Sequence, residues 1–352
     1  MNVLGIESSC DETGASIVSD GRIMLSNAVA SSLELHRNYG GVVPEIAARS
    51  HIQSIIPVIE ESLAESSLDW NDIDAIAVTN GAGLGGSLLV GVATARTLAI
   101  TKNKPLYAVN HVAGHVYANF ITETSLNSYS LPNNQPDFPL LALIVSGGHS
   151  QLVYFENHFK YQLLGQTRDD AIGEAFDKVA RIIGLPYPGG PSIAEAALLG
   201  DPNQFILPKA KMAKYDFSFS GLKTAVLRLS QELIGEDYRF PSFKLAERLN
   251  STQKANIAAS FQRVAIESVV DKALTAYNEY KPKSFVIAGG VASNLELRRQ
   301  IKSRFSIDVS YTDPKLCTDN GAMIACIGYY QAKFGINLAD PYSLAIQPNL
   351  VM

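Results

Sequence analysis

The chain has 352 residues, 47% hydrophobic and 18% charged, so it can build buried sheets and does not have the composition of a disordered protein. At about 150 residues per domain, this length predicts two domains. The formal net charge of −5 excludes the broadly basic surface typical of nucleic-acid binders, so any RNA contact must be local or shared with a partner.

Cysteine usage indicates a reducing compartment. Cys10, Cys317 and Cys326 lie far apart and form no CxxC pair, which argues against a disulfide framework and against a thiolate zinc site. The first residues show no basic segment followed by an apolar stretch, and no uninterrupted apolar run reaches about 18 residues. We therefore expect neither export nor a membrane span, and a cytoplasmic location.

The first part of the chain reads as three strands, a helix and a strand–helix–strand–helix unit. A polar turn (SCDETG, 9–14) separates the first two strands. The expected elements are strands at 2–8, 15–20 and 23–29, a helix at 44–66, a strand at 73–81, a glycine-rich loop at 81–87, a helix at 88–102, a strand at 105–110 and a helix from His111.

The second part repeats this order after a polar, proline-marked linker loop at 122–139. A helix-rich stretch at about 190–282 reads as an insertion. A repeat at this length scale predicts a duplicated α/β domain. The other expected elements are strands at 140–146, 151–157 and 161–167, a helix at 169–185, a strand at 283–290, a helix at 294–305, a strand at 307–313 and a helix at 320–334.

Two histidines, His111 and His115, stand four residues apart in NHVAGHVYA. On a helix this spacing places both rings on one face, close enough to bind one metal ion. Two ordinary histidines at a helix start remain the alternative. The glutamate of an HExxH motif is absent, which disfavours a zincin-type protease. Asp319 is the candidate third ligand, with a plain helix cap as its alternative.

Three glycine pairs follow strands or open helices and indicate a nucleotide site. The pair 147–148 (IVSGGHS) leaves backbone amides accessible, although a tight hairpin would also explain it. The pair 289–290 ends a buried strand before a helix near Asn294, and the pair 189–190 opens another helix. Neither GxxxxGK[ST] nor a strand-linked GxGxxG is present, which excludes a P-loop and the usual dinucleotide fingerprint.

Taken together, these residues and their surroundings resemble the tRNA threonylcarbamoyladenosine transferases, the family called TsaD in bacteria. The resemblance runs nearly end to end, with all the motifs in family order. The motifs are GIESSCDETGASIV, GGVVPEIAARSH, NHVAGHVYA, VSGGHSQL, DDAIGEAFDKVAR, YPGGPSI, FSFSGLKTAV, GGVASN and CTDNGAMIA.

The resemblance implies an α/β, actin-like ATPase (ASKHA) fold, with two duplicated ribonuclease H-like lobes around a nucleotide and metal cleft. The first lobe is expected at 1–121, with a helical segment at 325–352 returning to it. The second lobe is expected at 140–324, including the insertion.

The implied reaction transfers a threonylcarbamoyl group from threonylcarbamoyl-AMP to the exocyclic amine of the adenosine 3′ to the anticodon, in tRNAs that read ANN codons. At matching positions, His111, His115 and Asp319 would hold one divalent ion, iron (Fe²⁺) favoured and zinc possible. Asp11 is the candidate to orient or deprotonate the amine, with Glu12 supporting it. The adenylate would be held by Ile144, Val145, Ser146, Gly147, Gly148, Asp177, Gly190 and Asn294.

The implied partners are tRNA, the proteins TsaB and TsaE, and a TsaC-type synthase that makes the donor. An apolar helix face near RSHIQSIIPVIEESL is a candidate TsaB surface, with core packing as its alternative. The phosphates of the tRNA are expected to contact two lysine- or arginine-rich stretches, 207–214 and 295–305, or a partner protein. The alternative functions are a metal-dependent glycoprotein endopeptidase (O-sialoglycoprotein endopeptidase) and an ATPase or kinase of the actin-like fold.

Overall fold

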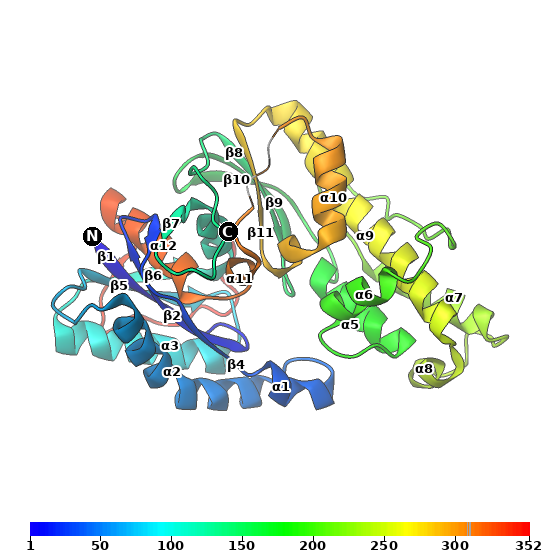
Figure 1. Ribbon diagram of the computed structural model, residues 1–352, viewed down its shortest axis with the longest axis horizontal. Helices are drawn as coiled ribbons and strands as arrows, with labels where there is room; N and C mark the ends of the chain where they lie inside the picture. Colours follow the sequence, from blue (N-terminus) through cyan, green and yellow to red (C-terminus); the bar gives the residue numbers. More distant parts are fainter. Residues whose placement is uncertain (308, 310) are drawn as a thin grey trace. The chain divides into compact units, whose positions relative to one another are not determined.

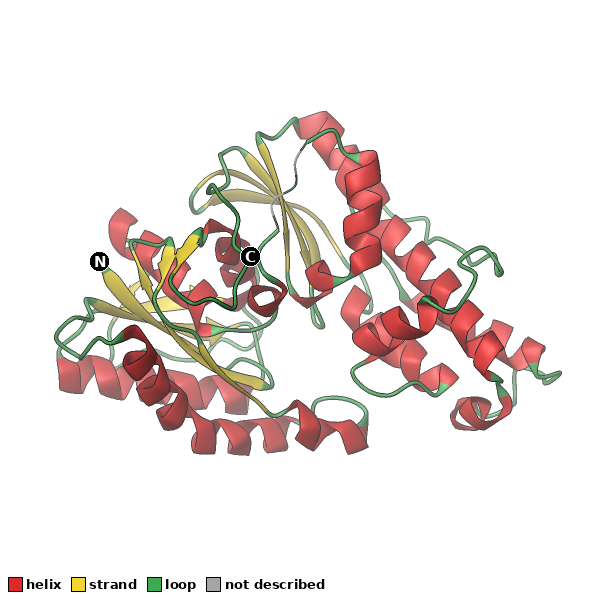
Figure 2. Ribbon diagram, viewed as in Figure 1, coloured by secondary structure: helices red, strands yellow, loops and turns green. Residues whose placement is uncertain are grey.

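The computed structural model describes residues 1–307, 309 and 311–352. The chain divides into two units, residues 1–136 with 310–352, and residues 137–309. Each unit contains a β-sheet and helices (Figures 1 and 2). The strand expected at 307–313 falls partly on positions 308 and 310, which lie outside the described residues.

The first unit is built on a mixed sheet with strand order β12-β6-β5-β1-β2-β3-β7, in which β4 also pairs with β2. β1 is antiparallel to β2 and parallel to β5. The strands are β1 (Asn2–Glu7), β2 (Glu12–Ser19), β3 (Ile23–Met24), β4 (Ala28–Ser31), β5 (Ala75–Gly81), β6 (Leu106–Asn110), β7 (Glu123–Thr124) and β12 (Leu338–Ala339). The α-helices are α1 (Leu33–His36), α2 (Pro44–Ser66), α3 (Gly85–Lys102), α4 (His111–Tyr117), α11 (Pro314–Cys317) and α12 (Gly321–Phe334).

Successive side chains of β1 point to opposite faces of the sheet, and both faces are covered by helices. Leu4 and Ile6 belong to a buried cluster with residues of α2 and α3, such as Ile55 and Val92. Gly5, between them, faces α12 on the other side of the sheet, where the Gly321 carbonyl approaches closely. Helices therefore lie on both faces of β1.

The second unit has a four-stranded sheet of order β10-β9-β8-β11, in which β8 and β11 are parallel. The helices α6, α7 and α10 pack against the long helix α9. The strands are β8 (Leu140–Val145), β9 (Ser150–Asn157), β10 (Lys160–Gln166) and β11 (Ser284–Ala288). The α-helices are α5 (Ile172–Ile183), α6 (Gly189–Ala197), α7 (Ser220–Leu233), α8 (Leu245–Arg248), α9 (Ser251–Tyr280) and α10 (Leu295–Arg304).

The single strand expected at 23–29 was wrong, because the chain breaks there into β3 and β4. The Ser26 hydroxyl lies 2.7 Å from the Ser62 hydroxyl, and the Asn27 amide donates to Glu65 at 2.8 Å. Both partners lie at the end of α2. These bonds draw residues 26 and 27 toward that helix, out of the strand.

The segment that returns to the first unit begins at residue 310. The expected start at 325 falls inside α12, and the whole of this helix packs on β1 and β2. The expected linker at 122–139 contains β7, which pairs with β3, and the division between the units follows residue 136.

Candidate metal centre and ligand loops

The start of α4 is set by Asn110, the last residue of β6. Its side-chain oxygen accepts hydrogen bonds from the amides of Val112 and Ala113, at 2.9 and 3.2 Å, so the helix begins at His111. His111 and His115 are one turn apart on the same face, and both are buried. Their ring centroids lie 4.7 Å apart with the ring planes at 77°.

Asp319 joins the two histidines from the short segment between α11 and α12. One of its carboxylate oxygens, Oδ1, lies 3.5 Å from His111 Nε2 and 3.3 Å from His115 Nε2. The alternative that Asp319 caps the following helix was wrong. The cap of α12 is Asn320, whose side-chain oxygen accepts from the Met323 amide at 3.0 Å.

The three side chains fit a divalent metal ion. Their candidate ligand atoms all lie within 4.8 Å of one another. Two ligand atoms bound to one ion at about 2.1 Å each would be roughly 3.4 Å apart in tetrahedral geometry, close to the separations of Asp319 from each histidine. Among the described residues, neither ring nitrogen of the buried His115 has a hydrogen-bond partner. Buried polar atoms normally have a partner, and a metal ion would provide one here.

A buried carboxylate behind His111 orients its ring. His111 Nδ1 lies 3.1 Å from Glu7 Oε2, which also accepts from the Thr79 hydroxyl at 2.6 Å. The other oxygen of Glu7 accepts from the Ser9 amide at 2.5 Å. Because Nδ1–H donates to Glu7, Nε2 presents its lone pair toward Asp319 and His115.

The charges around His111 favour a cation at this place. Burial alone would lower the pKa of His111, but the carboxylates of Asp319 and Glu7 raise it to about 9. Burial would likewise raise the pKa of Glu7, but His111 holds it below its usual value. A divalent ion at the two Nε2 atoms would occupy the position that these carboxylates otherwise favour for a proton.

The predicted catalytic pair lies on the turn from β1 to β2. Asp11 is in this turn, and Glu12 is the first residue of β2. The same turn reaches the metal centre, because Ser9 Oγ is 3.0 Å from His111 Nδ1. Burial, with the negative charges of Asp11 and Asp319, raises the pKa of Glu12 to about 10.

The predicted adenylate residues all lie in the second unit: Ile144 to Gly148 at the end of β8, Asn294 after β11, Asp177 in α5 and Gly190 in α6. Ile144 and Val145 are buried in β8, and the turn that follows exposes Gly147 and Gly148. A side chain at Gly289, after β11, would meet the Val145 carbonyl, so the two strand ends approach closely.

The remaining predicted adenylate residues lie on or next to helices of the second unit. The Asp177 carboxylate accepts from the Gly189 amide at 2.7 Å, which links α5 to the first turn of α6 next to Gly190. Asn294 caps α10, and its side chain also donates to Gln262 at 2.9 Å. A Cβ added at Gly147, Gly148 or Gly190 would meet no atom within 4 Å. Packing does not require these glycines, so they leave room beside exposed amides.

The sequence interpretation missed Glu7, which orients His111. The available signal was a lone carboxylate in the apolar strand NVLGIE, because a fully buried glutamate requires partners. The interpretation also gave no role to His36 and His51, which are fully buried in the first unit.

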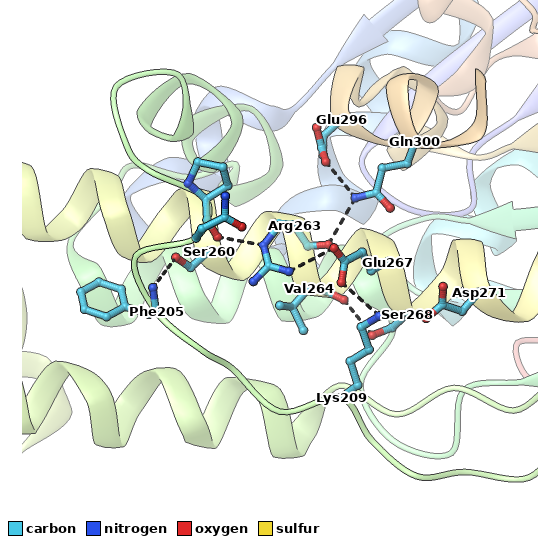
Figure 3. Close-up of polar contacts among 12 residues, drawn as sticks. Phe205, Lys209, Ser260, Arg263, Val264, Glu267, Ser268, Asp271, Glu296 and Gln300 are labelled. Atoms are coloured by element: carbon cyan, nitrogen blue, oxygen red, sulfur yellow. Dashed lines mark hydrogen bonds and ion pairs between the residues drawn. The ribbon is translucent and has the colours of Figure 1, made fainter. Parts of the chain in front are cut away.

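Several cations of the two basic stretches are engaged by acidic side chains. Lys209 pairs with Glu267 and Asp271, at 3.0 and 2.8 Å, beside the network of Arg263 on α9 (Figure 3). Further pairs join Lys214 to Glu279, Arg299 to Glu296, and Arg304 to Asp271. Because these cations are paired within the chain, the two stretches have the character of solvated charged faces and not of a broad phosphate-binding surface.

A protein-family model described as "TsaD: tRNA N6-adenosine threonylcarbamoyltransferase" matches residues 23–326. A tRNA N6-adenosine threonylcarbamoyltransferase from Thermomicrobium roseum is 47% identical over 344 residues, covering 96% of this chain and 93% of its own. The protein of the same name from Dictyoglomus turgidum is 45% identical over 356 residues, covering 100% and 99%.

Solved structures support the predicted fold class. Component A of the (R)-2-hydroxyglutaryl-CoA dehydratase of Acidaminococcus fermentans matches with a TM-score of 0.50 and 16% identity, over 95% of this chain and 99% of its own. HypF from T. kodakarensis matches with a TM-score of 0.55 and 13% identity, over 96% and 48%. The α/β, actin-like ATPase (ASKHA) fold is thus confirmed. No helix within the described residues is long and apolar enough to cross a membrane.

Proposed function

Since the chain belongs to the TsaD family of tRNA N6-adenosine threonylcarbamoyltransferases, we propose that it transfers threonylcarbamoyl from threonylcarbamoyl-AMP to tRNA. The acceptor is the exocyclic amine of the adenosine 3′ to the anticodon in tRNAs that read ANN codons. The observation that carries the proposal is the cluster of His111, His115 and Asp319, with the ring nitrogens of His115 lacking hydrogen-bond partners.

The donor is an acyl phosphate mixed anhydride, which is already activated. The protein therefore has to orient the reactants and stabilise charge, and it needs no covalent nucleophile. Asp11 orients the amine and accepts its proton, while Glu12 donates a hydrogen bond in its protonated form. The backbone amides at Gly147, Gly148 and Gly190 bind the adenylate, together with Ile144, Val145, Ser146, Asp177 and Asn294.

The metal ion is held by His111, His115 and Asp319. Two imidazoles and a carboxylate suit both iron and zinc, so zinc is possible, although Fe²⁺ is favoured. When bound, this ion supplies Lewis acidity for a phosphate or carbonyl oxygen. Glu7 keeps the His111 ring in the orientation for binding.

The endopeptidase alternative is less well supported. It requires a carboxylate that can activate water beside the histidines. Glu7, which contacts His111, is fully buried, and its two oxygens accept bonds from Ser9 and Thr79. It therefore has the environment of an orienting residue.

The proposed partners are tRNA, TsaB and TsaE, with a TsaC-type synthase as the source of the donor and the cytoplasm as the location. α2 supports the TsaB surface, because it presents apolar side chains on two faces. Ile55 and Ile59 are buried in the core, whereas Ile52 and Ile56 are 65% and 50% exposed.

Replacement of His111 by alanine tests the proposal. With adenylate donor, an anticodon stem-loop, TsaB and TsaE, we expect the wild type to form threonylcarbamoyladenosine. The His111→Ala variant should lose both bound metal and product, and His158→Ala, in the second unit, should keep both. No modified nucleoside from the wild type would contradict the function, and full metal content in His111→Ala would contradict the ligand assignment.

A further inference from the structure

His51 lies inside the first unit, where its ring bonds to the turn that carries Asp11 and Glu12. The side chain is 0% exposed, although it belongs to α2, a helix with an exposed face. Its Nε2 lies 3.0 Å from the carbonyl oxygen of Cys10, and its Nδ1 lies 2.8 Å from the Thr13 hydroxyl. The His51 ring therefore bonds the residues that precede and follow Asp11 and Glu12 in the sequence.

These partners determine which nitrogen of His51 carries the proton. A carbonyl oxygen only accepts, so Nε2 must be protonated and must donate to Cys10. In the neutral ring, Nδ1 then accepts from the Thr13 hydroxyl. Burial lowers the pKa of His51, which keeps the ring neutral.

A second buried histidine, His36, contacts Ser32, which in turn hydrogen-bonds the carbonyl of Asp11. The Val43 amide donates to His36 Nδ1 at 3.2 Å, so the proton of His36 is on Nε2, 3.1 Å from Ser32 Oγ. The Ser32 hydroxyl donates to the carbonyl of Asp11 at 2.8 Å, and the Ser32 amide donates to the same oxygen at 3.0 Å.

Three successive carbonyl groups of the turn are therefore held by donors outside it. The Ser9 carbonyl accepts from the Leu84 amide at 2.8 Å. The Cys10 carbonyl accepts from His51 and, at 3.3 Å, from the Ser87 hydroxyl, and the Asp11 carbonyl accepts from Ser32. These bonds fix the peptide planes around Asp11. Ser9 Oγ lies 3.0 Å from His111 Nδ1, so the turn also lies beside the metal centre.

We propose that His51 and His36 are positioning residues for the transfer reaction: through the carbonyls of Cys10 and Asp11, they aim the carboxylates of Asp11 and Glu12 at the reacting groups. The inference rests on the proposed function, in which these carboxylates act on the amine. Neither histidine touches the substrate. Reacting groups held out of alignment by about 1 Å can lose roughly 100-fold in rate, so a peptide rotation here is expected to appear in kcat.

Two amide substitutions separate the donor role of His51 from its packing role. In His51→Gln, the side-chain amide reaches the place of Nε2 and can still donate to Cys10. In His51→Asn, the shorter side chain reaches only the place of Nδ1, so it can bond Thr13 but not Cys10. Both variants replace the ring with a neutral amide and differ mainly in which bond survives.

The variants are compared in the full chain with partner proteins, at saturating adenylate and varied tRNA. We expect His51→Asn to lower kcat by about 10- to 100-fold, with the KM for tRNA and the metal content unchanged. His51→Gln should keep kcat within a few-fold of the wild type. Equal kcat values for the two variants, or loss of metal in His51→Asn, would overturn the inference.

Ser32 supplies a second test if His51→Asn does not fold. Ser32→Ala removes the hydroxyl between His36 and the Asp11 carbonyl, and it should lower kcat with KM unchanged, while Ser32→Thr keeps the hydroxyl and should restore the rate. An unchanged kcat in Ser32→Ala would overturn the inference. Absence of product from the wild type would instead contradict the proposed function.

Discussion

The orientation of the His111 ring depends on contacts at Nδ1 with Ser9 Oγ and with Glu7, a carboxylate that is not among the candidate metal ligands. Glu7 is fully buried, and its oxygens contact His111, Thr79 and the Ser9 amide. A carboxylate behind a metal-binding histidine fixes the ring tautomer and makes the coordinating nitrogen a better donor. Metal affinity should therefore depend on the charge of Glu7.

We predict that Glu7→Gln weakens metal binding by about 10- to 100-fold, because the amide keeps the size of the side chain but loses its charge. Titration of the metal-free protein with Co²⁺, followed by its visible absorption, measures this affinity directly. The exposed Glu61→Gln on α2 is the matched control and should bind like the wild type. Equal affinities for the two variants would show that the charge of Glu7 does not contribute to metal binding.

Glu12 makes the stability of the metal-free protein dependent on pH. Burial and neighbouring negative charges raise its folded-state pKa to about 10, from an ordinary value of 4.5. Below about pH 4.5 the group is protonated in both folded and unfolded chains. As the pH rises toward 10, the unfolded chain releases this proton and the folded chain retains it, so stability falls.

The Glu12→Gln variant cannot ionise, so its advantage in thermal midpoint over the wild type should increase between pH 5 and pH 9. Thermal unfolding in the presence of a chelator measures this difference at each pH. For Glu61→Gln, the difference from the wild type should not change over the same range. A constant difference for Glu12→Gln would mean that its carboxyl ionises normally in the folded protein.

Single-sequence reasoning went furthest where chemistry is local. The spacing of His111 and His115 is a local signal that favours a metal site, whereas Asp319, far away in the chain, was joined to them as a ligand through the resemblance to the TsaD family; the structure brings the three together. Glu7 and His51 were not predicted, because their partners lie 104 and 41 residues away in the chain. No local pattern distinguishes a buried orienting histidine from an ordinary one.

Between elements of the first unit, α12 approaches β1 closely. A Cβ at Gly5 would overlap the carbonyl of Gly321 and the amide of Ala325, and one at Gly14, in β2, would lie 2.7 Å from the Gly321 amide. Gly321, Ala325 and Gly328 lie at helical spacing along α12. This row of small residues was the signal in the sequence for close helix–sheet packing.

We predict that Gly5→Ala destabilises the protein by about 3 kcal/mol or more, because backbone atoms rather than flexible side chains must move. Chemical denaturation measures the change. Gly221→Ala is the matched control, since its Cβ meets nothing within 4 Å and it lies in α7, where alanine is the better helix former. A loss below about 1 kcal/mol for Gly5→Ala would show that the contact can relax.

The predicted element boundaries agree with the structure where the hydrophobic periodicity is strong. They are wrong where side chains of another element bond to the segment. The helix expected at 44–66 has those bounds in the structure, despite Pro57 inside it. The strand expected at 23–29 is divided, because Ser62 and Glu65 bond residues 26 and 27. The alternation of apolar and polar residues in a sequence does not predict such long-range polar contacts.

On the scale of the whole molecule, the first unit is discontinuous in sequence and the second is continuous. α12 packs on β1, and β12 pairs with β6 at the edge of the sheet. Arg96 of α3 donates to the carbonyls of Pro341 and Tyr342, each at 2.6 Å. The duplicated α/β pattern predicted two units, but only the tertiary contacts show that the return includes all residues from 310.

The two units differ in whether a fragment of the chain contains all that is needed to fold. A fragment of residues 137–309 contains every strand and helix of its unit, so it should unfold cooperatively with heat. A fragment of residues 1–309 lacks α12, which leaves the face of β1 that carries Gly5 uncovered, and it also lacks Asp319. Thermal unfolding of 1–309 should show only the transition of the 137–309 fragment, without bound metal. A second cooperative transition would contradict this dependence on the returning segment.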